Sequence, residues 1–577
     1  MLEAVKNVNS FLPSFIKAFL SIVCGGLYSW AILKGAGVSC HSFQIVTMTG
    51  LLLFSLQTKK LFWYLIFPLC TLLALYFPVG LHYGMPEYGH IASLFATDAT
   101  ESTDFISAIP FWHFVAPVFL IGALLLAKFL FGYFSIQFCS PRNFCFFLLA
   151  FLLSLLPILG WESARYEVTE YFRLIPWWKY TIFILLCVSF VFLLRQTPNS
   201  RRSVSIPTLI TLAAFGIAYI CGDFRPIYKG IKGTIVVLKE NRLLKSLIKS
   251  NDWDIVASAP KHQINVLIIG ESARRDYMHA YGYPVRNTDF MDSVPGTVFD
   301  GFISEGDETI PSLRRALTHS RPSGAEINYS LNIIGLAKKA GLSTSWFSNQ
   351  GFSDSTPISA IGSLADRKKW NRVGYTRTWS DFDLLPLLRA EIQRPDEKPK
   401  LIVLHLNGSH PGVCGSVNPD QYISKVGDPY YKEAFCYVES IRNTDKLLGL
   451  IYDALKASKQ TFSMLYFSDH GLSHSEMAGQ LVIKHGHPSD RCRDIPLFQA
   501  SSEDLQHVTV KGRRFGDSLT EGISHWLGIA TKQIPTPKDL FAPGIDPDTH
   551  GHESLMKQRR LDPAINILEH QKETGSP

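Results

Sequence analysis

Several features that mark common protein classes are missing from this chain of 577 residues. Its Lys and Arg residues give a net charge of +7, but they form no stripe interleaved with aromatic residues, so we expect no nucleic-acid partner. The sequence also has no internal repeat and no low-complexity tract. Because 577 residues are too many for one compact domain, at least two units are expected.

Cysteine is scarce in the polar part of the chain, which begins at about residue 260. Only Cys414, Cys436 and Cys492 lie there, whereas the other seven cysteines lie in the apolar part and are expected to be packing residues. If the polar part is extracytoplasmic, Cys414 and Cys436 could close a disulfide, and Cys492 would be left over. In the cytosol all three would stay reduced.

Long apolar runs rich in Phe, Leu, Ile and Trp dominate residues 1–222. A membrane-spanning helix needs about 20 apolar residues, so these runs predict a transmembrane domain of about five to seven spans. No small-residue cleavage site follows the first run, which we therefore interpret as an anchor and not as a removable signal peptide. The candidate segments are 11–33, 42–58, 61–83, 111–134, 143–160, 179–195 and 206–222.

The loop 84–110 contains no Lys or Arg but four acidic residues. If all seven segments span, most basic residues of the other short loops fall on the opposite side, and basic loops tend to stay in the cytoplasm. This bias places the N-terminus inside and everything after residue 222 outside. The result depends on an odd number of spans, because removing one weak helix would move the polar part into the cytoplasm.

Residues 223–260 carry several basic residues among Ile, Val and Leu. Such a stretch beside a span can lie in the lipid headgroup region, or it can be a solvated linker helix. We assign 1–222 to the transmembrane domain, 223–260 to an amphipathic linker at the membrane surface, 261–550 to a soluble domain and 551–577 to a C-terminal tail.

The soluble domain contains three apolar runs typical of buried parallel strands: Ile264–Gly270, Leu401–Leu406 and Phe462–Phe467. Helical patterns at Ile333–Ala340 and Ala434–Ala457 alternate with them. This alternation predicts an α/β domain with a mostly parallel central sheet. Ligands of such sheets bind at the carboxyl ends of the strands.

Polar side chains that bind metals follow these strands. Glu271 comes directly after the first, and Asp469-His470 come directly after the third. His405 and His410 accompany the second strand, and His485 lies in a later loop. A single His after a strand is usually structural, but carboxylates and imidazoles from several strand ends can converge on Zn²⁺.

Together these segments resemble the alkaline phosphatase and sulfatase superfamily, and specifically the bacterial membrane-bound phosphoethanolamine transferases that modify lipid A and lipopolysaccharide core. The resemblance covers the N-terminal spans, the basic linker and the soluble domain. It implies a polytopic α-helical membrane domain followed by a periplasmic catalytic domain of alkaline phosphatase/sulfatase type. The motifs that carry it are Ile269–Arg274, Thr309–Leu313, His405–Pro411, Ser468–Gly471 and His485-Gly486.

The resemblance also implies roles for single residues. Glu271, Thr309, Asp469 and His470 would bind one zinc ion tightly, with Thr309 as the nucleophile. The remaining histidines of these motifs would bind a second zinc ion or the phosphate and would protonate the leaving group. These histidines are His405, His410 and His485.

A threonine hydroxyl is a poor nucleophile at neutral pH, and coordination to Zn²⁺ lowers its pKa. By resemblance, attack on phosphatidylethanolamine in the bacterial inner membrane would leave phosphoethanolamine on Thr309 and release diacylglycerol. An acceptor on lipopolysaccharide (lipid A or core) would then collect the group. We expect membrane lipids as surroundings and a monomeric enzyme.

Thr309 has competing interpretations. Ser304, Ser312 and Thr318 are hydroxyls nearby, and Thr309 could instead cap a helix over 311–318. The two roles are compatible, because a helix N-terminus also binds phosphate well.

Substrate contacts are expected from His410, His485 and two further places. Relatives have Asn, Thr and Glu at intervals of four in the loop 84–110, where this chain has Ser93, Thr97 and Glu101. On a helix these three would share one face, although a merely solvated face has the same spacing. Asn349 also resembles a family position.

Other functions predict different motifs. Sulfatases use a modified Cys or Ser, and no Cys-x-Pro-x-Arg motif occurs at Thr309. A membrane-anchored phosphatase-like hydrolase, or a phosphoglycerol transferase that uses manganese, would share the design of the chain. Periplasmic glucans are an alternative acceptor. A catalytically inactive domain would lack metal ligands, and all of the expected ones are present.

Overall fold

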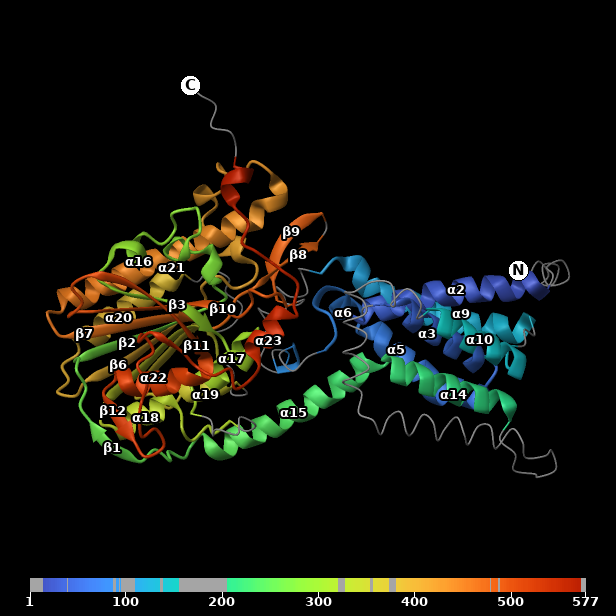
Figure 1. Ribbon diagram of the computed structural model, residues 1–577, viewed down its shortest axis with the longest axis horizontal. Coiled ribbons are helices and arrows are strands. Elements are labelled where there is room, and N and C mark those ends of the chain that lie inside the picture. Colours follow the sequence, from blue (N-terminus) through green and yellow to red (C-terminus); the bar gives the residue numbers. More distant parts are fainter. Residues whose placement is uncertain are drawn as a thin grey trace, which may run out of the picture. The chain divides into compact units, whose positions relative to one another are not determined.

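The computed structural model describes residues 14–38, 40–86, 90–92, 94, 109–134, 138–154, 205–319, 327–352, 356–372, 380–477, 479–485 and 488–571. The chain divides into two compact units (Figure 1). Unit 1 comprises Met1–Glu87 and Ser107–Gly233, and unit 2 comprises Tyr88–Ile106 and Thr234–Pro577.

Unit 1 is helical, as expected of apolar runs that must satisfy their own backbone hydrogen bonds in lipid. Ile16–Gly35 and Phe111–Tyr133 are long and apolar enough to cross a membrane, and there are up to four such spans in the described residues if each bent helix pair counts as one. The helices are α2 (Ser14–Gly35), α3 (Ser42–Ser55), α4 (Lys59–Leu61), the π-helix Phe62–Ile66, α5 (Phe67–Leu75), α6 (Phe77–Tyr83), α9 (Phe111–Phe134), α10 (Pro141–Ser154) and α14 (Ile206–Cys221).

Large apolar side chains on these helices are exposed, as a lipid-facing surface requires. Phe19 of α2 is 56% exposed, and Trp112 and Phe119 of α9 are 74% and 69% exposed. The predicted helical membrane domain is therefore confirmed. The candidate segment 179–195 lies outside the described residues, and the number of spans stays a prediction.

The predicted linker 223–260 contains a helix and a strand. α15 (Arg225–Leu247) occupies most of it, and β1 (Ile255–Ser258) pairs with β12 (Ile529–Thr531) of unit 2. The end of this segment is therefore part of the soluble domain.

Unit 2 is built on a nine-stranded sheet with the order β13-β11-β3-β10-β7-β2-β6-β4-β5. Only β10 runs antiparallel to its neighbours, so the predicted mostly parallel sheet is confirmed. The strands are β2 (Ile264–Gly270), β3 (Gly296–Ile303), β4 (Ser343–Gly351), β5 (Arg367–Arg372), β6 (Lys400–His405), β7 (Phe462–Ser468), β10 (Asp494–Ser501), β11 (His507–Phe515) and β13 (Gly544–Ile545).

The three strands expected from the sequence are neighbours at the centre of this sheet, in the order β7-β2-β6. A separate hairpin pairs β8 (Ser473–Met477) with β9 (Gln480–Lys484). The helices of unit 2 are α16 (Asp289–Ser293), α17 (Thr309–Ala316), α18 (Ile333–Lys339), α19 (Pro357–Gly362), α20 (Leu384–Gln393), α21 (Lys432–Ala457), α22 (Leu519–Trp526) and α23 (His552–Lys557).

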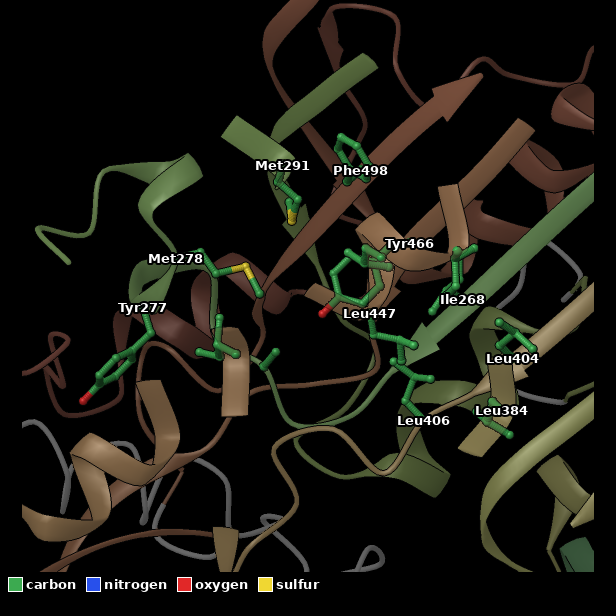
Figure 2. Packing of buried hydrophobic residues seen from close by; sticks show 14 of the residues in the cluster. Ile268, Tyr277, Met278, Met291, Leu384, Leu404, Leu406, Leu447, Tyr466 and Phe498 are labelled. Carbon is green, nitrogen blue, oxygen red and sulfur yellow. The ribbon is translucent and has the colours of Figure 1, made fainter. Parts of the chain in front are cut away.

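The sheet is buried on both faces, because successive side chains of a strand point to opposite sides. On β2, Val266 and Ile268 belong to one hydrophobic core, whereas Leu267 belongs to the other. Helices α20 and α21 cover the first face, and α17, α18 and α22 cover the second. Figure 2 shows the first core, where Ile268 and Leu404 of adjacent strands lie close to Leu447 of α21.

A disulfide joins Cys414 to Cys436, which the sequence left open. It ties the short 3-10 turn Val413–Gly415, which follows β6, to the first turns of α21. Cys492 is a buried free cysteine whose sulfur lies 2.8 Å from the Ser473 hydroxyl. Since disulfides persist in oxidising compartments, this bond agrees with an extracytoplasmic domain.

Replacing both Cys414 and Cys436 by Ala should lower the free energy of unfolding by about 3 kcal/mol, because the bond closes a loop of 22 residues in the unfolded chain. Chemical denaturation of the purified protein measures this. Reductant should lower the Tm of the wild type and of a Cys492→Ala control, but not the Tm of the double variant. If reductant does not change the Tm of the wild type, the result would contradict the Cys414–Cys436 disulfide.

Candidate active site

Two carboxylates lie side by side because β2 and β7 are paired in parallel with Gly270 opposite Ser468. Glu271 and Asp469 are the next residues on each strand, and both are buried. His470 follows directly and is buried as well. The predicted convergence of polar residues at the strand ends is thus a consequence of strand register.

Ser272 holds this pair of carboxylates together. Its backbone N–H donates to Asp469 Oδ1 at 2.9 Å, and its hydroxyl donates to Glu271 Oε1 at 2.5 Å. It does so with φ of 59°, a left-handed conformation that is unusual for a serine. Such strain is common at functional sites, where the surrounding structure imposes it.

The loop after β6 supports Glu271 from the other side. The Ser409 N–H donates to the Glu271 carbonyl at 3.0 Å, which brings Gly408 against the Glu271 backbone. A Cβ at Gly408 would lie 2.7 Å from that carbonyl oxygen, and its φ is +45°, so glycine is needed there. Asp381 accepts hydrogen bonds of 2.8 Å from the N–H groups of Asn407 and Gly408 and so anchors the loop.

Thr309 is the first residue of α17, and Glu308 is the N-cap. The Thr309 Oγ1 atom lies 3.2 Å from Glu271 Oε2 and 3.4 Å from His470 Nε2. The hydroxyl therefore faces the carboxylates and does not cap the helix. At this position a phosphate would also meet the N-terminal N–H groups of α17.

Asp307 fixes the turn that carries Thr309. Arg493 donates to it from Nε at 2.8 Å, and Arg559 donates from Nη1 at 2.7 Å. Burial alone would raise the pKa of Asp307, but these two guanidinium groups hold it well below its usual range. The turn is thus held by an ionised carboxylate.

The side chains around Thr309 fit a zinc ion. His470 Nε2 lies 3.5 Å from Glu271 Oε1 and 3.3 Å from Asp469 Oδ2, and its Nδ1 lies 2.8 Å from the Gly471 carbonyl oxygen, to which an Nδ1–H would donate. That tautomer leaves the Nε2 lone pair facing the carboxylates. Asp469 Oδ2 is buried and has no hydrogen-bond partner among the described residues.

The shifted pKa values of Glu271 and Asp469 also favour a bound cation. Burial and the neighbouring Glu271 charge raise the pKa of Asp469 well above its usual range. Burial also opposes ionisation of Glu271, but His470, His410 and the Ser272 hydroxyl lower its pKa to about 2. A divalent cation between the carboxylates would allow both to ionise, which is the arrangement zinc ligands adopt.

Two of the three predicted histidines join this site. The His485 ring lies 5.0 Å from the His470 ring and 6.1 Å from the His410 ring, measured between centroids. Burial, together with His470 and His410, keeps the pKa of His485 well below its usual range.

His405 is set apart from them. Its Nδ1 pairs with the Ser348 hydroxyl at 3.1 Å, and its ring packs edge-on against Trp346 inside the domain. Burial lowers the pKa of His405 to about 4. Its Nε2 is buried without a hydrogen-bond partner among the described residues, and the Glu271 charge acts on this imidazole, so the predicted role of His405 stays a prediction.

The predicted substrate contacts have different outcomes. Asn349 is fully buried, and its amide nitrogen donates to Asp381 at 2.8 Å while its amide oxygen accepts from Asn371 at 2.8 Å. It therefore supports the Asp381 side chain and does not face a substrate. The other three, Ser93, Thr97 and Glu101, lie outside the described residues.

One residue of the same loop does reach the site. His90 belongs to unit 2, and its Nε2 lies 3.5 Å from Oε1 of Glu308, the residue before Thr309. Ile91 and Ala92 are buried in the second hydrophobic core of that unit.

Gln350 was assigned no role from the sequence, although it touches a predicted zinc ligand. Its Nε2 donates to Glu271 Oε2 at 2.6 Å and to the Leu406 carbonyl at 3.0 Å. Ser272 and Asp381 were missed as well. Ser272 is adjacent to Glu271 in the Ile269–Arg274 motif, whereas Gln350 and Asp381 reach this part of the site only through the tertiary structure.

Gln350→Ala should weaken zinc binding by about 10- to 100-fold, because groups that orient metal ligands have effects of this size. Competition with a chromogenic chelator measures the affinity. Gln421→Ala is the matched control, since Gln421 pairs with Asn443 elsewhere in the domain. Equal affinities of the two variants would show that Gln350 does not orient Glu271.

Comparisons with known proteins agree with this arrangement. The family model described as Sulfatase matches residues 263–529. A putative phosphoethanolamine transferase of Haemophilus influenzae is 32% identical over 487 residues, which cover 82% of this chain and 86% of that protein. The phosphoethanolamine transferase OpgE of Escherichia coli is 29% identical over 474 residues, covering 80% and 79%.

Among solved structures, the integral membrane protein lipooligosaccharide phosphoethanolamine transferase A of Neisseria meningitidis aligns with a TM-score of 0.54. The alignment covers 89% of this chain and 96% of that one at 15% identity, so the likeness is one of fold.

Proposed function

This chain belongs to the phosphoethanolamine transferases of the alkaline phosphatase/sulfatase superfamily, and from that premise we propose that it transfers phosphoethanolamine by way of Thr309. The supporting observation is the Thr309 hydroxyl, which lies at the start of α17 and faces Glu271 and His470. The proposed donor is phosphatidylethanolamine.

In the proposed first step, the Thr309 oxygen attacks the phosphorus atom, and the bond from phosphorus to the glycerol oxygen breaks. The proton of the Thr309 hydroxyl passes to an imidazole, and the glycerol oxygen takes a proton from an imidazole as diacylglycerol leaves; His410 and His485 are the proposed proton carriers. Zinc held by Glu271, Thr309, Asp469 and His470 would lower the pKa of the hydroxyl and offset charge on the phosphoryl oxygens. The α17 N-terminus adds N–H groups that favour an anion.

In the proposed second step, an acceptor oxygen attacks the same phosphorus atom and Thr309 is restored. We propose a cell-envelope glycolipid as the acceptor, on lipid A or on the lipopolysaccharide core. A periplasmic glucan offers the same hydroxyl chemistry and stays the alternative.

We propose that one zinc ion is sufficient. With His405 paired to Ser348, the imidazoles of His410 and His485 are left beside the zinc ligands. A His485 ring nitrogen lies within 4.8 Å of a Glu271 oxygen and a His470 nitrogen, so His485 shares the carboxylate of the first zinc site, and no separate carboxylate among the described residues supports a second zinc ion there.

We also propose that the catalytic domain lies in the periplasm, attached to the inner membrane by unit 1. The Cys414–Cys436 disulfide and the acidic loop 84–110 support this orientation. The contact between His90 and Glu308 supports a role for that loop in binding the donor headgroup. Ser93, Thr97 and Glu101 remain its proposed contacts.

Thr309→Ala should abolish the covalent intermediate, because among the described residues the Thr309 hydroxyl contacts both Glu271 and His470, whereas the nearby Ser272 hydroxyl is bound to Glu271 Oε1. Intact-protein mass spectrometry after incubation with phosphatidylethanolamine should show one phosphoethanolamine adduct on the wild type and none on the variant. Thr309→Ser is the matched control and should retain the adduct at a lower rate. A glycerol phosphate adduct, or an adduct on Thr309→Ala, would refute the proposal.

The acceptor is identified by comparing cells that express the wild type with cells that express Thr309→Ala. Mass spectra of lipid A, of the core oligosaccharide and of the periplasmic glucans should differ by phosphoethanolamine in a lipopolysaccharide fraction. A difference in the glucan fraction alone would show that periplasmic glucans, and not lipopolysaccharide, are the acceptor. If all three fractions match, none of these acceptors is the substrate.

A further inference from the structure

A second group of metal-binding side chains lies in unit 2, outside the site described above. Glu305 follows β3, and His550 and His552 lie at the start of α23. The ligand atoms of these three residues lie within 4.8 Å of one another. Asp517, in the 3-10 turn Gly516–Ser518, stands beside them.

The separations in this group are those of an ion-pair network, and three of its ligand atoms lie close enough for small shifts to place them around one zinc ion. Glu305 Oε1 lies 3.0 Å from His552 Nε2, and Glu305 Oε2 lies 3.1 Å from His550 Nδ1. Asp517 Oδ2 lies 3.6 Å from the same His550 nitrogen. Tetrahedral zinc with bonds of about 2.0–2.2 Å holds its ligand atoms about 3.3–3.5 Å apart. The corresponding separations around Thr309 are 3.2–3.5 Å.

Two atoms of the group are left without hydrogen bonds among the described residues. These are Glu305 Oε2 and His550 Nδ1, which are buried and face each other. The Glu305 side chain has no exposed surface, whereas the His550 side chain is 21% exposed. Glu305 Oε2 forms an ion pair with His550 when that imidazole is protonated, and with a neutral imidazole a cation reached through the His550 side would satisfy both atoms.

The neighbouring groups also have to be compatible with a cation. The Asp517 N–H donates to Glu305 Oε1 at 3.2 Å, and Thr549 donates to Asp517 Oδ2 at 3.2 Å, so both carboxylates are oriented. Arg493 Nη1 lies 2.5 Å from His552 Nδ1. With a metal on Nε2, His552 would carry its hydrogen on Nδ1, so metal binding requires Arg493 Nη1 to leave this nitrogen, while Arg493 Nε can still hold Asp307.

We infer that Glu305, His550 and His552, with Asp517 as the fourth ligand, form a structural zinc site separate from the catalytic one. Two imidazoles and two carboxylates are a ligand set that zinc accepts. The ion would tie the segment before α23 to the loop between β3 and α17. That loop carries Asp307 and Thr309, so the second zinc ion would help to hold the nucleophile in place.

Zinc content of the full-length purified chain tests the inference, after equilibration with Zn²⁺ alone at a free concentration set by a chelator. The wild type should hold two zinc ions per chain, His550→Ala one, Asp469→Asn one, and the double variant none. His525→Ala is the matched control with two, because His525 contacts neither site. His550 is chosen for its partial exposure, which makes loss of folding improbable as an explanation.

Thermal unfolding provides a second measurement that does not depend on transfer activity. In the Asp469→Asn background, Zn²⁺ at about 100 times its Kd should raise Tm by several degrees, and adding His550→Ala should remove that rise. If His550→Ala keeps the wild-type zinc content and the rise in Tm, the group is an ion-pair network and the inference is wrong. If the wild type holds one zinc ion and His550→Ala holds none, zinc binds at the Glu305 group and not at the catalytic site. That result would refute only the proposed catalytic zinc.

Discussion

The chemistry of this protein depends on the enforced closeness of two buried carboxylates. Parallel pairing of β2 with β7 puts Glu271 and Asp469 side by side, away from water. Two negative charges in that position repel each other strongly, because little solvent screens them. The sheet supplies the rigidity that keeps them there, since both strands lie at its centre with hydrophobic cores on either side. A cation is the natural partner for such a site.

Most of the remaining site serves to hold these carboxylates. Ser272 adopts a left-handed conformation to donate two hydrogen bonds, Gln350 donates a third, and Asp381 anchors the loop that touches Glu271. Thr309, the proposed nucleophile, is positioned by a separate interaction, in which Arg493 and Arg559 donate hydrogen bonds to Asp307. The proposed metal ligands and the proposed nucleophile are thus supported by different parts of the domain, which contact each other through Thr309 and through the Ser312 hydroxyl, a donor to the Asp469 carbonyl at 2.6 Å.

The proposed substrate gives a reason for the membrane unit. The proposed donor is a lipid, so an enzyme attached to the bilayer meets it at high local concentration without extracting it into water. The residues 90–92, which connect helices of unit 1 along the chain, pack into unit 2 beside Glu308. A headgroup held there would lie next to the nucleophile.

The sequence by itself determined the class of each unit and the three central strands, because apolar runs are local patterns, and it singled out Glu271, Asp469 and His470 at the strand ends as candidate metal ligands. It also singled out Thr309, His410 and His485, through motifs of its family. It could not show that His405 pairs with Ser348 or that Asn349 supports Asp381, since side-chain direction depends on neighbouring strands. The roles of Ser272, Gln350 and the Glu305 group were not predicted from the sequence, for the same reason. Their partners lie between 79 and 247 residues away along the chain, and only the tertiary structure brings them together.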